Sequence, residues 1–563
     1  MNYCPERPSQ SSPSTLNLTI TPHFTAAAEA DRLSVQLTLQ APHCAAHLPL
    51  FLFETYYGNV PAHPYTERDI TACDAAGPLP LYFIDPTNAD QEWRVDRDTV
   101  GDVQLRFVVG PRAVDITTPV GPRVDLRRDQ GGLIGNGRWF LPRPAAYDRI
   151  YRHVVAWDLS HAAAAAQRTR AVWSFGEGPD PVVKVGPPTV LIDSVYMVGP
   201  IKSYPCSSST TTVGSPPRAQ IYWFGELPDN LRRLNTYNIQ LYPKLAAFFR
   251  DREAGSYHIF IRRVLRGFGG HGCQQSYVLE YDDASRTETE EELVALFSHE
   301  MVHSFVMMGP EADGYDNGWF VEGLAQLYSA YLPYRFGLRG ADYLRNRVNA
   351  YLSAYGTSPR IGMDARDSQT EFYDDWYAEL IPYMRGCAYL LQVDGRLRRI
   401  TGRFGREADG PLDEIVIDMA RRWRSGQRLR ASDWLEYLRP FLGAGVAGEL
   451  QDMLGGRVLN LGGTVVIYED WVLSPSEQEI LEFGFSLSSV NRRVICGVVA
   501  GSRAADAGLE DGLPLVASSR AGRCSTSLSA TMDVVVERGD DRVQISYRPR
   551  SFDKARVWQL EWS

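Results

Sequence analysis

The sequence predicts a multidomain α+β protein: a β-sandwich-like N-terminal part, a mixed central part with a largely helical second half, and a strand-rich C-terminal end. Three observations support this. The 563 residues are too many for one hydrophobic core, so about three domains are expected. Short alternating segments dominate to about residue 175, and helical periodicity dominates 288–454. Glycine pairs at 455–456 and 462–463 indicate a flexible boundary before the final strands.

The N-terminal part carries the clearest strand signals. Residues 16–20 and 33–39 alternate between apolar and polar side chains, as expected of a half-buried antiparallel sheet. We therefore expect a disordered tail over 1–15 and a β-rich domain over 16–180. The alanine run at 162–166 is compatible with a helical turn or with a loop.

The next segment, assigned to a second domain over 181–460, mixes both periodicities. Strands are predicted at 189–193, 220–224 and 258–261, and a helix at 231–249. Residues 206–217 are rich in serine and threonine and too polar to fold alone, so we expect an exposed insertion without a functional role.

A helix beginning near residue 290 carries the most informative motif. Thr289 with Glu292 three residues later is a capping-box start, and the apolar residues that follow have helical spacing. His299 and His303 lie four apart, so both imidazoles can reach one zinc ion. Glu300, beside the first histidine, would then stand where it can accept a proton from metal-activated water.

Glu322, in a second predicted helix over 319–332, is the expected third zinc ligand, leaving a fourth position open. The alternative is a helix that carries two histidines by coincidence. The apolar residues around the pair argue against it, because unpaired histidines and a glutamate would be costly to bury. The sequence thus predicts one Zn²⁺ ion held by His299, His303 and Glu322, with Glu300 as the general base.

Composition excludes several other classes of function. The net charge is -10 and the isoelectric point near 5.6, which disfavours nucleic acids and anionic membranes as partners. We find no signal sequence and no apolar run long enough to span a bilayer. The eight cysteines are scattered without a Cys-x-x-Cys pair, so reduced thiols and a cytoplasmic location are expected.

The C-terminal block, assigned to 470–563, has its own pattern. Phe483-Gly484-Phe485 is predicted to open a strand, a second strand is predicted at 495–499, and a short glycine-closed helix at 501–509. This order resembles a PDZ domain, which binds a peptide C-terminus at its glycine-containing loop. The alternative is an ordinary small β-domain, and Gly512-Leu513 stands where an aspartate commonly follows the glycine.

Taken together, the chain resembles the glycyl aminopeptidase family of gluzincin zinc metallopeptidases. The resemblance covers nearly the whole chain as domain order, and its specific motifs are Ser298-His299-Glu300-Met301-Val302-His303, Trp319-Phe320-Val321-Glu322-Gly323 and Tyr383-Met384-Arg385-Gly386. It implies a thermolysin-like catalytic domain, a PDZ domain and hydrolysis of peptides. It also implies that Tyr383 donates a hydrogen bond to the developing oxyanion, with Tyr389 as the competing candidate.

One departure from the family concerns the substrate's N-terminus. Where the family has a Gly-Gly-x-Glu-His type segment, this chain has Gly269-Gly270-His271-Gly272-Cys273-Gln274. Gly272 replaces the glutamate that would meet a free amine, which puts aminopeptidase specificity in question. We expect Gly269, Gly270, His271 and Gln274 to contact substrate without supplying negative charge. Cys273 has no evident base partner and is not expected to be a nucleophile.

Two other functions are compatible with these features. The chain could be a non-catalytic, PDZ-type peptide-binding protein with a relic zinc site, although Glu300 and Tyr383 have no reason to persist in a relic. It could also be a gluzincin endopeptidase or a hydrolase of a non-peptide substrate.

Overall fold

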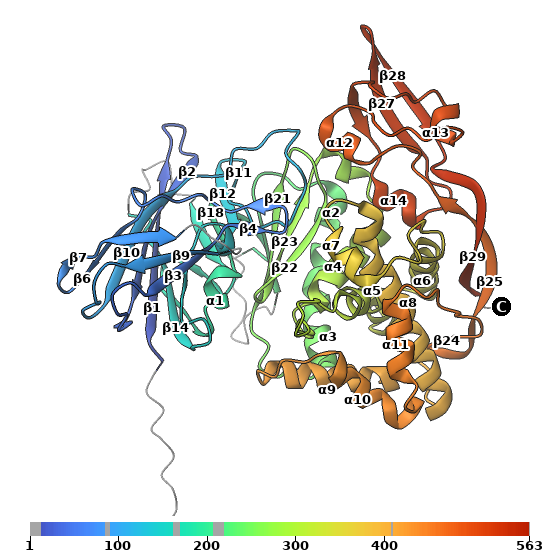
Figure 1. Ribbon diagram of the computed structural model, residues 1–563, viewed down its shortest axis with the longest axis horizontal. Helices are drawn as coiled ribbons and strands as arrows, with labels where there is room; N and C mark the ends of the chain where they lie inside the picture. The colour runs from blue at the N-terminus through green and yellow to red at the C-terminus, as the bar shows by residue number, and fades with distance from the viewer. Residues whose placement is uncertain (1–12, 85–89, 161–168, 207–218, 407–408, 562–563) are drawn as a thin grey trace, which may run out of the picture. The chain divides into compact units, whose positions relative to one another are not determined.

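The computed structural model describes residues 13–84, 90–160, 169–206, 219–406 and 409–561 (Figure 1). Most of the predicted tail, the alanine run at 162–166 and residues 207–217 lie outside the described residues. The chain divides into two compact units. The first comprises residues 1–113, 120–232 and 255–286, and the second comprises 114–119, 233–254 and 287–563.

The first unit is rich in β-sheet. Its seven-stranded sheet has the order β17 (Val182–Gly186), β14 (Tyr151–Trp157), β1 (Thr15–Phe24), β2 (Ala30–Leu39), β10 (Val103–Val109), β6 (Thr71–Asp74) and β7 (Gly77–Pro78). A four-stranded sheet has the order β13 (Arg143–Pro144), β3 (Pro49–Glu54), β9 (Asp90–Val95) and β8 (Leu81–Ile84). Leu18 and Leu37 of the first sheet share one buried cluster with Phe51 and Trp93 of the second. The two sheets therefore enclose a common core, as the alternating pattern predicts.

Two five-stranded sheets complete this unit. One has the order β11 (Arg127–Asp129), β12 (Gly132–Asn136), β18 (Val195–Gly199), β15 (Arg170–Trp173) and β16 (Gly176–Gly178). The other has the order β19 (Lys202–Tyr204), β20 (Ala219–Trp223), β21 (Tyr257–Arg263), β23 (Ser276–Tyr281) and β22 (Gly269–Cys273). The strands predicted at 220–224 and 258–261 are confirmed as β20 and β21. Short elements fill the connections: β4 (Tyr56–Tyr57), β5 (Val60–Pro61), a 3₁₀ turn η1 (Gly137–Trp139), α2 (Asp229–Arg233) and η3 (Asp283–Thr287).

The strand predicted at 189–193 is wrong, because this segment forms the short helix α1 (Thr189–Ile192). Pro187 and Pro188 precede it, and proline presets the backbone angle of a first helical turn. Val190, Leu191 and Ile192 are all buried. A short run that is apolar on every side does not distinguish a helix from a strand by its periodicity.

The second unit is mostly helical. Its helices are α3 (Asn235–Phe248), α4 (Glu290–Val302), α5 (Gly318–Arg335), α6 (Ala341–Gly356), α7 (Ala365–Thr370), α8 (Trp376–Thr401), α9 (Pro411–Arg424), α10 (Ala431–Leu442) and α11 (Val446–Leu454). Helices α5 and α8 touch through glycine. A Cβ atom on Gly323 would lie 2.5 Å from the carbonyl carbon of Gly386, and one on Gly386 would lie 2.1 Å from the Trp319 oxygen. This close crossing brings the segment of Glu322 near that of Tyr383.

The chain ends in two three-stranded sheets within the same unit. One has the order β24 (Val465–Val466), β25 (Tyr468–Leu481) and β29 (Arg550–Glu561), and the other β26 (Leu515–Ser518), β27 (Met532–Arg538) and β28 (Asp541–Tyr547). The accompanying helices are α12 (Ser488–Arg492), α13 (Arg503–Asp506) and α14 (Ala521–Thr526). Strand β29 is tied to α6, because the amide side chain of Asn349 bonds both the N–H (2.6 Å) and the carbonyl (3.2 Å) of Leu560.

The strand predicted at 495–499 is also wrong, as is the strand expected to follow Phe483-Gly484-Phe485. Only two backbone hydrogen bonds link these segments, from Ser486 to Cys496 (2.9 Å) and from Val499 to Gly484 (2.8 Å). Helix α12 lies between them in the chain, and the Ser489 hydroxyl accepts the N–H of Cys496 at 2.9 Å. The Ser489 side chain thus accepts a backbone N–H that a neighbouring strand would otherwise bond. The short helix expected within 501–509 is confirmed as α13.

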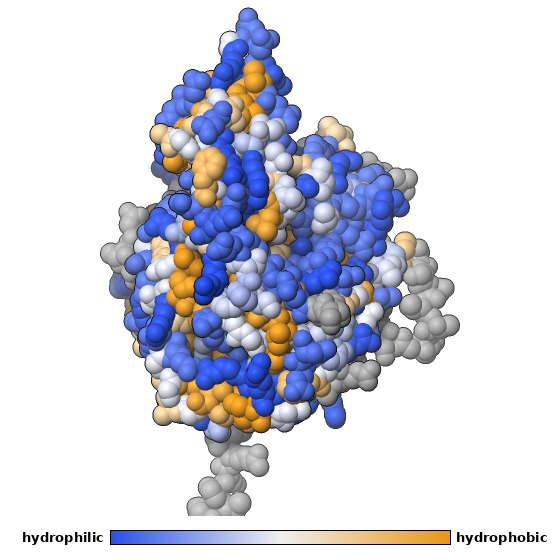
Figure 2. Space-filling view, turned by 90° about the vertical axis from the view of Figure 1, so that its right-hand side faces the viewer, coloured by the Kyte–Doolittle hydropathy of each residue, from blue (hydrophilic) through white to orange (hydrophobic). Residues whose placement is uncertain are grey.

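Among the described helices, none combines the length and the apolar composition needed to span a membrane. The face drawn in Figure 2 is mainly hydrophilic, with its apolar residues in several separate groups.

Glu288, just before α4, gives a testable pH dependence. Its side chain is 9% exposed and lies 3.5 Å from the guanidinium of Arg520, in the C-terminal block. Burial raises the pKa of Glu288 to about 7; Arg520 opposes the rise and Glu292 adds to it. The unfolded chain keeps an ordinary pKa near 4.5. Between these values the unfolded state loses its proton first, so stability falls as the pH rises.

Glu288→Gln is therefore expected to raise the free energy of unfolding at pH 8 by on the order of 1–2 kcal/mol, with a much smaller gain at pH 5. Urea unfolding at the two pH values measures this difference. An equal effect at both would show that the charge of Glu288 is not responsible.

Candidate metal centre

Helix α4 presents the metal motif and is capped as the sequence predicts. The Thr289 hydroxyl accepts the N–H of Glu292 (3.3 Å), and the Glu292 carboxylate accepts the N–H of Thr289 (2.9 Å). Glu290 and Glu291 add negative charge at the positive end of the helix dipole. All residues of 293–302 except Leu296 are buried, so packing fixes the register of the helix. The motif therefore stands on a rigid support.

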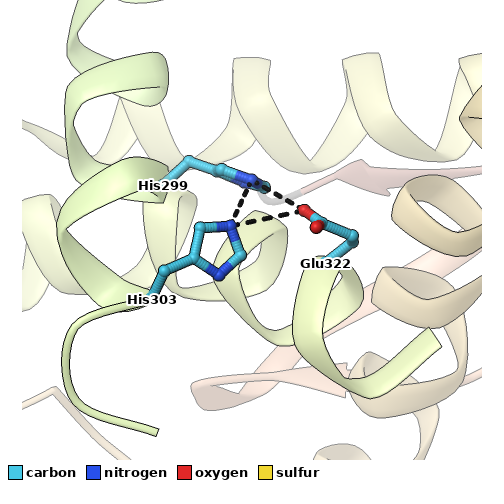
Figure 3. Close-up of side chains that lie close together, drawn as sticks. All are labelled: His299, His303 and Glu322. Carbon is cyan, nitrogen blue, oxygen red and sulfur yellow. Dashed lines mark hydrogen bonds and ion pairs between the residues drawn. The ribbon is translucent and has the colours of Figure 1, made fainter. Parts of the chain in front are cut away.

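The two histidines lie on one face at the end of this helix. His299 is in the last turn, and His303 follows with helical backbone angles (φ -55°, ψ -23°). Their Nε2 atoms are 3.0 Å apart (Figure 3). His299 is 6% exposed and His303 is half-buried.

Glu322 reaches the same point from α5. Helix α5 begins after Asn317, a fully buried residue in the left-handed conformation (φ 54°). The Asn317 amide donates to the Gly309 oxygen (3.0 Å) and to Glu311 (2.8 Å), which fixes the start of the helix. Glu322 Oε2 lies 3.1 Å from His299 Nε2 and 3.4 Å from His303 Nε2.

This donor set fits zinc. Ligand atoms about 2.0–2.1 Å from a tetrahedral zinc ion lie about 3.3 Å from one another, and the three separations here are 3.0, 3.1 and 3.4 Å. Hydrogen bonds alone would not account for all three contacts among His299, His303 and Glu322, since each neutral imidazole has only one N–H to donate. Within the described residues, this is the one group of three His, Cys, Asp or Glu side chains close enough to hold a metal ion. Two nitrogens and one carboxylate leave a fourth position for water or substrate.

The electrostatics of the trio favour a cation. Burial alone would raise the pKa of Glu322, but His303 and His299 hold it well below its ordinary value. Burial alone would lower the pKa of His303, but Glu322 raises it. The Glu322 carboxylate thus faces positive charge on His303, and a bound metal ion would supply that positive charge instead.

Glu300 and Tyr383 flank the ligands. Glu300 follows His299 in α4 and is buried. The Tyr383 ring, on α8, stacks on the His299 imidazole with 5.6 Å between ring centroids and an interplanar angle of 18°. Tyr389 is placed differently. Its hydroxyl accepts the indole N–H of Trp434 at 3.2 Å, and burial raises its pKa to about 12. Of the two tyrosines predicted as alternatives, Tyr383 is the one in contact with a ligand.

The predicted substrate-contact residues lie in the first unit. Gly269, Gly270 and His271 belong to β22, the edge strand of its sheet, and Gln274 follows in the turn. The His271 ring packs edge-on against Tyr57 with a centroid distance of 5.6 Å. The three candidate metal ligands belong to the second unit. Contact of these four residues with a substrate therefore stays a prediction.

Some supporting contacts were not predicted from the sequence. Tyr237 of α3 donates its hydroxyl to Ser298 (2.7 Å), which in turn donates to the Val294 carbonyl (2.7 Å). Sixty-one residues separate this pair, so no local pattern signals it. The sequence could have indicated Asn317, because asparagine is a preferred residue at a helix start. The Nδ1 atom of His299 is buried without a hydrogen-bond partner in the described part of the chain.

Comparison with solved structures identifies the fold. An aminopeptidase N family protein from Idiomarina loihiensis aligns with 97% of this chain over 98% of its own length, with a TM-score of 0.64 and 14% identity. A mutant M1 zinc metallopeptidase from Deinococcus radiodurans, bound to a Tyr-Ser-Ala substrate, aligns with 79% of this chain over 94% of its own, with a TM-score of 0.48 and 15% identity. No protein-family model matches the sequence, and no curated protein resembles it significantly. The chain has the fold of the aminopeptidase N family protein, which agrees with the predicted multidomain α+β class.

Proposed function

We propose that this protein is a zinc-dependent, aminopeptidase-like enzyme that hydrolyses peptide bonds with metal-activated water. The observation that carries the proposal is the convergence of three metal-binding atoms, 3.0–3.4 Å apart, beside Glu300 and Tyr383. His299, His303 and Glu322 would hold the ion. The fold shared with an aminopeptidase N family protein is consistent with this chemistry.

When bound, zinc would polarise the peptide carbonyl and make water nucleophilic near neutral pH. Glu300 would take up the proton that water loses during attack and return it to the leaving amine. The Tyr383 hydroxyl would donate a hydrogen bond to the carbonyl oxygen as negative charge develops there. The stack on His299 limits the positions that the tyrosine ring can take, which favours a preorganised donor.

The C-terminal block is proposed to be PDZ-like and to bind peptide C-termini. Gly484 has a left-handed backbone (φ 74°), and a Cβ atom there would meet Ala504 at 2.6 Å and Ser502 at 2.7 Å. The glycine loop therefore packs directly on the small-residue helix α13, and these are two of the sequence features on which the PDZ resemblance rests. With it we propose a β-rich domain at 16–180 and a catalytic domain at 181–460. A cytoplasmic location stays a prediction.

Metal removal tests the enzymatic proposal. The purified protein is expected to contain about one zinc per chain and to hydrolyse short peptides. A chelator is expected to abolish the hydrolysis, and added Zn²⁺ to restore it. Hydrolysis that survives complete metal removal, or a zinc-loaded protein that cleaves neither free nor N-terminally blocked peptides, would refute the proposal.

A further inference from the structure

Helix α8 is interrupted directly before Tyr383. Pro382 lies inside the helix and has no N–H, so the carbonyl of Ala378 cannot receive the usual helical hydrogen bond. The hydroxyl of Ser368, a buried residue of α7, donates to that carbonyl instead at 2.9 Å. A proline inside a helix is also a point where the helix can bend. The direction of the turn before Pro382 therefore influences where Tyr383 lies.

The first turn of α8 is docked on the C-terminal block. Asp375 caps this turn by accepting the N–H of Tyr377 at 2.8 Å. The Tyr377 hydroxyl accepts the N–H of Phe483 at 3.4 Å. The rings of Trp376 and Tyr377 pack against the Phe483 ring, with centroid distances of 5.4 and 5.7 Å. One phenylalanine of the C-terminal block thus holds the part of α8 that precedes the proline.

Phe483 gives this turn a fixed support. Its side chain is 1% exposed and belongs to the buried core of the C-terminal block. The Tyr547 hydroxyl donates to its carbonyl at 2.5 Å. Two residues earlier, the Leu481 N–H donates to the carbonyl of Thr357, at the end of α6, at 2.9 Å. Because Phe483 is anchored in this way, Tyr377 takes its position from Phe483.

The contact matters because an oxyanion donor must be placed accurately. The stack on His299 fixes the plane of the Tyr383 ring, but a ring can still slide within that plane. How far the hydroxyl reaches then depends on the backbone of Tyr383. A displacement of about 1 Å in a catalytic group can lower a rate by about 10²-fold.

We propose that Tyr377 is a positioning residue for Tyr383: its contacts with Phe483 hold the first turn of α8 and thereby place the oxyanion donor at the metal centre. This role rests on the proposed peptidase function. The competing explanation is that Tyr377 only stabilises the fold. The two differ when Tyr383→Phe is also present, because a residue that acts through the donor has nothing left to position once the donor hydroxyl is gone.

Kinetics of the zinc-loaded protein on a short peptide provide the first test. Tyr377→Phe, which removes the hydroxyl, is expected to lower kcat about threefold, and Tyr377→Leu, which also removes the ring, about tenfold. KM should stay within about twofold, because the donor bond forms mainly in the transition state. When Tyr383→Phe is already present, Tyr377→Leu should lower kcat by less than about twofold.

Tyr355 is the matched control residue. It is buried in α6, within the same unit, and its hydroxyl likewise accepts a backbone N–H, that of Leu459 at 3.0 Å. Tyr355→Phe and Tyr355→Leu should destabilise the fold at least as much as the Tyr377 substitutions, while kcat stays within about twofold of wild type. Thermal unfolding and zinc content of every variant show whether fold and metal are retained.

Three kinetic results would overturn the proposal. They are a Tyr377→Leu protein with the kcat of wild type, an equal loss of kcat from Tyr377→Leu with and without the Tyr383 hydroxyl, and a loss that Tyr355→Leu reproduces. A Tyr383→Phe protein with the kcat of wild type would overturn it as well, while leaving the peptidase proposal intact.

Amide hydrogen exchange of the metal-free protein separates this proposal from the peptidase proposal. Tyr377→Leu is expected to speed exchange of residues 379–387 about tenfold, and Tyr355→Leu less than about twofold. If wild type cleaves no peptide, the peptidase proposal fails, and exchange still decides whether Tyr377 holds the segment that carries Tyr383. Unchanged exchange in Tyr377→Leu would overturn the positioning role whatever the turnover.

Discussion

Glu300→Gln is expected to lower kcat for peptide hydrolysis by about 10²–10⁴-fold while the protein keeps its zinc. Glutamine has nearly the same shape as glutamate but does not accept a proton at neutral pH. Glu300 is buried one residue after His299, so the amide remains beside the ligands without replacing one of them. The measurement is kcat on a short peptide together with zinc content by atomic emission.

Glu291→Gln is the matched control, since Glu291 lies on the first turn of the same helix, far along it from the histidines. It should leave kcat within about twofold of wild type. Zinc bound at full occupancy with turnover that does not depend on Glu300 would exclude Glu300 as the base. Comparable hydrolysis of N-terminally blocked and free peptides would remove the aminopeptidase-like description.

Gly386→Ala is expected to destabilise the protein by about 3 kcal/mol or more, although alanine is the better helix former. The added methyl would lie 2.1 Å from the Trp319 oxygen and 3.0 Å from the Gly323 Cα. Both are backbone atoms, which no side-chain rotation can move aside. The helices α5 and α8 would have to separate, displacing Glu322 relative to Tyr383. Denaturant unfolding measures the loss, and zinc affinity should fall with it.

Gly448→Ala in α11 serves as the control, because a Cβ atom there meets nothing within 4 Å. It should be neutral or stabilising by up to about 1 kcal/mol. If Gly386→Ala unfolds at the same denaturant concentration as wild type, the two helix backbones are not in contact at this point.

Local chemical motifs could be predicted from the sequence, whereas contacts between residues far apart in the chain could not. The convergence of His299, His303 and Glu322 was predictable, because the two histidines lie four residues apart at the end of α4 and Glu322 lies on the next helix, α5. The choice of Tyr383 over Tyr389 came from resemblance, and only the fold shows which ring lies on His299.

The wrong strand predictions have different physical reasons. At 189–193 the buried apolar residues follow two prolines and form a helix. At 495–499 only Ile495 is buried, Gly497 has a left-handed backbone (φ 68°), and the Cys496 N–H bonds the Ser489 hydroxyl.

The bond between Asn349 and Leu560 has a consequence for synthesis on the ribosome. Asn349 of α6 is made 211 residues before Leu560, the residue of β29 that it bonds. Until β29 emerges, the face of α6 that β29 covers stays bare, and the long β25 strand has no β29 to pair with. A nascent chain therefore carries an open sheet edge and an uncovered helix until β29 has been made, which is the kind of surface that chaperones recognise.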